Sequence, residues 1–177
     1  PGERLLLIAP GGVVEDKRWP WERFAAVARR LVGGPLAGIR FESPVPSAQV
    51  KSAILLAGLS ADGETTVVEE TPTRDHTERV LFALGAPITV GREITVRRHQ
   101  HEGFSGRVPG DPSSAAFLVA AAALTGSEIT VRDVCLNTTR LHYLDVMRRM
   151  GIEVDLTIER EEMGEPVGSM WVRPPQG

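Results

Sequence analysis

The fold of this chain is decided by the stretch SAQVKSAILLAGLSADGETTV, residues 47–67, because a matching stretch, DPSSAAFLVAAAALTGSEITV, follows at residues 111–131. In both copies a mainly apolar run precedes a polar turn and a short β-branched run. A helix that is apolar around most of its circumference is buried on most sides, and β-branched residues are typical of strands. Each copy therefore predicts a buried helix, a turn and a strand.

The repeat continues beyond these stretches, because residues 73–90 match residues 138–156, with Gly85 aligned to Gly151. Each glycine follows a helical pattern that carries charge along one face, and it is placed to adopt left-handed backbone before the next strand. The sequence predicts duplication of a whole α/β subdomain rather than a short solenoid repeat. The predicted helices are 47–59, 75–84, 112–124 and 139–150, and further strands are predicted at EITVRR (93–98) and MWVRP (170–174).

Length, composition and charge limit the class of protein. With 177 residues, 42% of them hydrophobic, the chain can bury a substantial core. Its formal net charge of −3 gives no general attraction to nucleic acid or to anionic membranes, so neither is expected as a partner. The longest apolar run, residues 115–124, is too short to cross a bilayer, and no basic-then-apolar signal opens the sequence. We therefore expect a cytoplasmic protein.

The sequence offers no obvious metal site. Cys135 is the only cysteine, so no internal disulfide can form, and the run VRDVCLN around it holds no second thiol or histidine. We interpret it as a small packing residue. His99 and His101 lack a carboxylate or thiol at ligand spacing and are interpreted as part of a solvated turn.

The helix predicted at 47–59 begins with polar donors. Ser47, Gln49 and Lys51 stand at its start, where free backbone N–H groups and a partial positive charge favour anions. The alternative interpretation is purely structural: Ser47 caps the helix, Gln49 lies on the surface and Lys51 is a solvated charge. Asp111 and Pro112 are suited to cap and open the second helix.

Four motifs resemble the 5-enolpyruvylshikimate-3-phosphate synthase family, the 3-phosphoshikimate 1-carboxyvinyltransferases. They are PVPSAQVKSAILLAGLSADGETTV, TPTRDHTERVLFALG, VPGDPSSAAFLVAAAALTGSEITVRDVCLN and GEPVG. They stand in the family's order, and the resemblance covers about residues 35–177. It implies an inside-out α/β barrel fold of βαβαββ units, with helices inside and sheets outside. Residues 35–108 are expected to be the last unit of the first domain and 109–177 the first unit of the second.

The resemblance also implies an activity and a binding site. Family members transfer the enolpyruvyl group of phosphoenolpyruvate to the 5-hydroxyl of shikimate 3-phosphate and release phosphate, without metal or organic cofactor. Ser47, Ala48 and Gln49 match the family's Ser-Ala-Gln segment, which holds shikimate 3-phosphate, and Arg74 matches an arginine that contacts this substrate in part of the family. Lys51 fits the pattern but is given no role.

The family's early Gly-Asp-Lys-Ser stretch, its later acidic pair and its arginine-rich run do not occur in this sequence. We therefore assign no catalytic residue and expect the chain alone to be inactive. Two alternatives stay open: a relative of the UDP-N-acetylglucosamine enolpyruvyl transferases, or a catalytically inactive α/β module or fused fragment. We also expect self-association through apolar helix surface that further units would cover.

Residues 1–34 form a separate prediction. LLLIAPGGVVEDKRWPWERFAAVARRL resembles the strand–loop–helix of heptosyltransferase-like glycosyltransferases, with a strand at 4–9 and a helix at about 21–31. We expect a join near Gly33–Gly34 with a βα segment of different origin before it.

Overall fold

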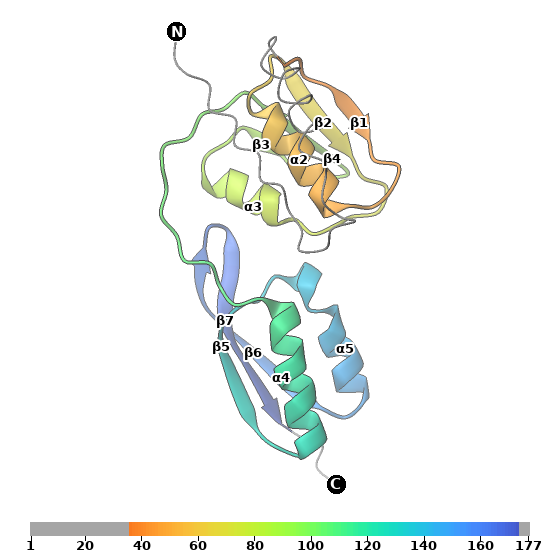
Figure 1. Cartoon of the computed structure of the whole chain (residues 1–177), viewed down its shortest axis with the longest axis vertical. Helices are drawn as coiled ribbons and strands as arrows, with labels where there is room; N and C mark the ends of the chain where they lie inside the picture. Colours follow the sequence, from red (N-terminus) through yellow and green to blue (C-terminus); the bar gives the residue numbers. More distant parts are fainter. Residues whose placement is uncertain (1–35, 174–177) are drawn as a thin grey trace, which may run out of the picture.

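The computed structural model describes residues 36–173, so the strand predicted at 4–9 and the helix predicted at 21–31 lie outside the described residues. The described part forms two units, one above the other in Figure 1, joined by a long connection after β4. The first unit contains β1 (Arg40–Glu42), α2 (Ala48–Gly58), β2 (Glu64–Val68), α3 (His76–Ala83), β3 (Ile88–Thr89) and β4 (Glu93–Arg97). The second contains α4 (Pro112–Thr125), β5 (Ile129–Cys135), η2 (Thr138–Arg140), α5 (His142–Arg149), β6 (Glu153–Glu162) and β7 (Glu165–Arg173).

The first unit is a four-stranded sheet in the order β1-β2-β4-β3, with helices on one face. β1 runs parallel to β2, as a strand–helix–strand crossover requires, and β4 pairs antiparallel with both β2 and β3. Its core joins Leu55 of α2 to Val67 of β2 and Ile94 of β4, each no more than 1% exposed. Its element order is βαβαββ.

The second unit repeats this order with one strand reduced to a single bridge. Its three-stranded sheet has the order β5-β7-β6, and Gly110 forms an isolated parallel bridge with Val134 where β1 lies in the first unit. A separate core gathers Val119 of α4, Leu144 of α5 and Met170 of β7. The predicted α/β fold, with an internally repeated unit, is confirmed.

Local signals placed the helices well. Ser47 accepts a hydrogen bond from the N–H of Val50, and Asp111 accepts from Ser113 and Ser114, so both predicted caps are confirmed. The predicted left-handed glycines are confirmed too, because φ is 72° at Gly85 and 88° at Gly151.

The single helix predicted at 139–150 was wrong at its start. The side chain of Asn137 accepts from the N–H of Thr139, which closes a short 3₁₀ turn, and α5 begins only after it. Asn is suited to such a turn because its side chain competes with the backbone for hydrogen bonds.

The expectation that the apolar helices are buried on most sides was wrong for this chain. Each packs on its own sheet with one side: α4 buries Val119 completely, whereas Phe117 is 79% and Leu124 89% exposed. Within residues 36–173 no second layer covers the other side of α4. None of the described helices has the length and apolarity that crossing a bilayer requires.

Candidate functional site

One cavity brings together all four residues that the sequence assigned to a site. Ser47, Ala48, Gln49 and Arg74 line a hollow of about 420 Å³ at the start of α2. The segment from Pro72 contributes its other wall on this unit, and Thr139 and His142 reach it from the second unit.

The start of α2 supplies donors to this cavity. The Ser47 hydroxyl accepts from the N–H of Val50 at 3.3 Å and donates to Gln49 Oε1 at 3.4 Å, and both distances are near the long limit for such bonds. The first backbone N–H groups of a helix have no partner within it, and together with the helix dipole they favour an anion. The arrangement at Ser47 and Gln49 can therefore bind a phosphate or carboxylate group.

Arg74 adds a positive charge on the opposite wall. It is exposed and stands just before α3. Among the described residues, its neighbours His76 and Arg79 make the polar side-chain contacts of this segment, to Glu165 and Asp75. The guanidinium of Arg74 is thus available to a ligand in the cavity.

Lys51 does not belong to the cavity, and both expectations for it were wrong. Its side chain is 2% exposed, and its Nζ lies 2.9 Å from Glu69 Oε2 and 2.6 Å from Glu78 Oε1. The reason is helical geometry: residue 51 lies on the same face of α2 as the buried residues Leu55 and Gly58.

This buried ion cluster instead connects the two walls of the cavity. Glu69 follows β2 and accepts a second hydrogen bond, from the hydroxyl of Thr73, through its other oxygen. Lys51 of α2 therefore holds the segment that carries Arg74, and so helps to set the separation of Arg74 from Ser47.

Sequence reasoning missed Thr139 and His142, although the repeat contained a signal for them. When Arg74 is aligned with Arg140, Thr139 stands opposite Thr73 and His142 opposite His76. The two copies meet at the junction between the units, so the equivalent residues Thr73 and Thr139 line one cavity, with His142 beside them.

Arg140, the counterpart of Arg74, has a different environment. Its guanidinium donates to Asp111 Oδ1 at 2.7 Å and to Ser113 Oγ at 2.8 Å. Desolvation disfavours the ionised form of Asp111, but the N–H of Ser113, the positive charge of Arg140 and the donors of Ser114 together outweigh it, so the pKa of Asp111 is lowered. Arg140 therefore stabilises the start of α4.

A polar network fastens the two units together beside the cavity. The amide of Asn137, which is fully buried, donates to Asp75 Oδ1 at 2.7 Å and to Glu165 Oε2 at 2.9 Å. Burial disfavours the ionised form of Asp75, but the hydrogen bond from Asn137 and the charge of Arg79 outweigh it, so the pKa of Asp75 is lowered. This network holds α3 against the second unit.

The sequence model described as EPSP synthase (3-phosphoshikimate 1-carboxyvinyltransferase) matches residues 24–174 of this chain. The chain belongs to the EPSP synthase family. A 3-phosphoshikimate 1-carboxyvinyltransferase of Anaeromyxobacter sp. (strain K) is 56% identical over 143 residues, which are 80% of this chain and 32% of the relative. A corresponding protein of Thermus thermophilus is 49% identical over 165 residues, 92% of this chain and 38% of the relative.

A solved EPSP synthase structure, from Acinetobacter baumannii, confirms the enolpyruvyl transferase fold class. It superposes with a TM-score of 0.72 at 42% identity, covering 80% of this chain and 32% of that one. The chain thus spans about a third of the length of its EPSP synthase relatives. The heptosyltransferase resemblance of residues 1–32 finds no support in these matches, since the family model already begins at residue 24.

Proposed function

We propose that this chain contributes the phosphate-binding part of a shikimate 3-phosphate site, within an enzyme that transfers the enolpyruvyl group of phosphoenolpyruvate to the 5-hydroxyl of that substrate and releases phosphate. The observation that carries the proposal is the single cavity lined by Ser47, Ala48, Gln49 and Arg74. These are the residues that match the family's substrate-binding segments. The relatives are 3-phosphoshikimate 1-carboxyvinyltransferases, which supports the same reaction.

The proposed binding role of each residue follows from its charge and its position in the cavity. The substrate phosphate lies at the start of α2, where the Ser47 hydroxyl and the backbone N–H groups donate to its oxygens. Gln49 lies on the ring side, and Arg74 neutralises charge from the opposite wall. Proton transfer and binding of phosphoenolpyruvate require further acids, bases and cations. No residue of this chain is assigned to those steps. The chain alone is therefore proposed to bind shikimate 3-phosphate but not to convert it.

The deciding experiment is a calorimetric titration of the 177-residue chain with shikimate 3-phosphate. Binding should weaken by at least about tenfold in Arg74→Ala, because a charge-assisted hydrogen bond contributes about 1.5–3 kcal/mol. Arg98→Ala is the matched control: this exposed arginine pairs with Asp62 away from the cavity, and its loss should leave the affinity unchanged.

Two further titrations complete the test. Inorganic phosphate should bind more weakly than shikimate 3-phosphate, since it lacks the ring that Gln49 would contact. Tighter binding of UDP-N-acetylglucosamine would move the assignment to the related nucleotide-sugar transferases. Absence of any binding by a chain that circular dichroism shows to be folded would identify an inactive α/β module.

We infer further that residues 35–108 and 109–177 are successive repeat units from two domains, with the junction near residues 106–111, in a cytoplasmic protein. Exposed apolar side chains on α4, chiefly Phe117 and Leu124, favour self-association with a second copy of this chain.

A further inference from the structure

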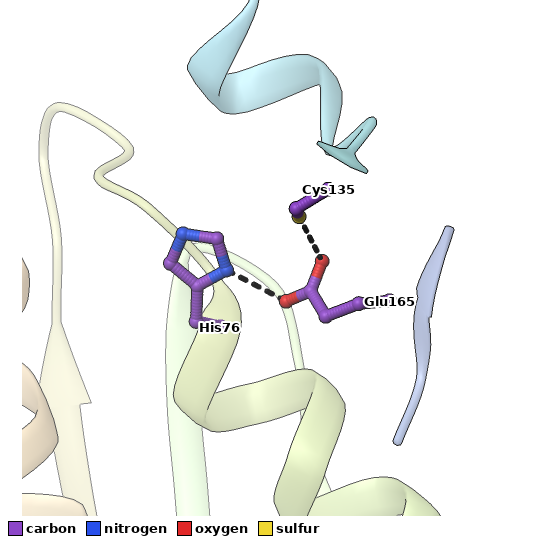
Figure 2. A group of neighbouring side chains, drawn as sticks. All are labelled: His76, Cys135 and Glu165. Atoms are coloured by element: carbon purple, nitrogen blue, oxygen red, sulfur yellow. Dashed lines mark hydrogen bonds and ion pairs between the residues drawn. The ribbon is translucent and has the colours of Figure 1, made fainter. Parts of the chain in front are cut away.

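Three potential metal ligands from three elements meet at the junction between the units (Figure 2). His76 is the first residue of α3, Cys135 the last of β5 and Glu165 the first of β7. Their ligand atoms all lie within 4.8 Å of one another. Ligand atoms around a tetrahedral zinc ion, each bound at about 2.0–2.3 Å, are about 3.3–3.8 Å apart. Small side-chain movements would therefore complete three corners of such a site.

Glu165 lies between the other two groups, as Figure 2 shows. Its Oε1 lies 2.7 Å from His76 Nδ1, and its Oε2 accepts from the thiol of Cys135 at 3.6 Å. Arg140 can only donate, and its Nη1 lies 3.4 Å from His76 Nε2, so the ring proton is on Nδ1. Two protons thus occupy the space between the three ligand atoms.

A single divalent cation can replace both protons. The thiol proton leaves to solvent, and the ring proton of His76 moves to Nε2, so the imidazole stays neutral and one proton is released in total. The thiolate and the carboxylate then balance the two positive charges of the ion. The new Nε2–H would then face the N–H of Arg140, donor to donor, so Arg140 has to turn away from the ring while Asp111 and Ser113 still accept from it.

The surroundings of the three side chains are suited to a bound metal ion. All three residues line a cavity of about 490 Å³, which gives access from solvent and room for a water as fourth ligand. Asn137 orients the carboxylate of Glu165 from the protein side, which is the usual task of a residue behind a metal ligand.

We propose that His76, Cys135 and Glu165 form a binding site for a divalent ion of the zinc class, which fastens α3 of the first unit to β5 and β7 of the second. The mixed nitrogen, sulfur and oxygen ligand set selects zinc or cobalt over magnesium or calcium, which prefer oxygen ligands only. The inference does not depend on the substrate assignment, since none of the three ligands is among the residues assigned to shikimate 3-phosphate.

Cobalt(II) is the probe for this site. Cys135 is the only cysteine of the chain, so a thiolate-to-cobalt charge-transfer absorption in the near ultraviolet reports on it alone. The band should saturate at one cobalt per chain and disappear in Cys135→Ser. In His76→Ala and Glu165→Gln the affinity should fall by at least about 100-fold, since loss of even an outer partner costs roughly 10–100-fold.

A matched control separates this site from surface histidines. His99 and His101 stand on the connection between the units with ring centroids 6.4 Å apart, and His101→Ala should leave the cobalt spectrum unchanged. Zinc should also raise the melting temperature of the wild-type chain but not that of Cys135→Ser, with circular dichroism showing that each variant is folded. The proposal is overturned if no thiolate band forms, if the band survives in both His76→Ala and Glu165→Gln, or if it saturates at half an equivalent with formation of a dimer.

Discussion

At the scale of single residues, Lys51 is the side chain whose position departs most from its local sequence. Its ammonium compensates two carboxylates that are 8% and 4% exposed, and removal of one partner from a buried ion cluster costs about 3–5 kcal/mol. We expect Lys51→Met to lower the free energy of unfolding by that amount in urea titrations. Arg97→Met, which breaks the exposed pair with Glu64, should change it by no more than about 0.5 kcal/mol. Equal effects of the two substitutions would contradict a structural role for the cluster.

Asp75 makes the stability of the junction depend on pH. Its folded pKa is lowered, so its contribution is fully present above the unfolded value of about 3.9 and is lost as the pH falls through the folded pKa. We expect the chain to lose stability in acid as the pH falls below about 3.9, and Asp75→Asn to flatten that part of the profile. Melting temperatures of the wild-type chain and of Asp75→Asn, measured between pH 3 and 7, test this prediction. Asp145→Asn, on the exposed side of α5, controls for the loss of one charge.

At the scale of elements, the turn between β6 and β7 depends on close backbone approach. Gly164 has φ of 79°, and a Cβ there would lie 2.8 Å from the carbonyl oxygen of Arg79 in α3. Gly126 also has positive φ, 65°, but a Cβ there would meet open space. Gly126→Ala should cost about 1–2 kcal/mol from left-handed backbone alone, and Gly164→Ala a further 1–3 kcal/mol from overpacking. Similar melting temperatures for the two variants would show that α3 does not pack on this turn.

The helices and caps could be predicted because their signals are local. Ser47 and Asp111 cap helices through residues two or three positions away. The burial of Lys51 could not be predicted, because Glu78 approaches it only after α3 has packed beside α2. For the same reason His142 was missed at the cavity: its place there follows from how the two units meet rather than from its neighbours in sequence.

At the scale of the whole molecule, apolar surface on α4 predicts concentration-dependent association. Phe117, Leu118 and Leu124 are 79%, 53% and 89% exposed on this helix. We expect sedimentation velocity to show oligomers at micromolar concentration, and Phe117→Glu with Leu124→Glu to shift the chain toward monomer. Val90→Glu, an exposed apolar residue of the other unit, should not. A sharply monomeric wild-type chain would contradict the prediction.

The two hydrophobic cores described above share no residue, and hydrogen bonds of His76 and Asn137 are among the contacts that link the two units. Cooperative opening follows contiguous packing, so each unit should act as its own protected block in amide hydrogen exchange. Val67→Ala, in the first core, should speed exchange in β2 and β4 while leaving β5 and β7 at their wild-type rates. Acceleration spread evenly over both sheets would mean that the junction transmits packing strain. The two units are thus expected to open independently, so that a substitution that destabilises one unit leaves the other folded.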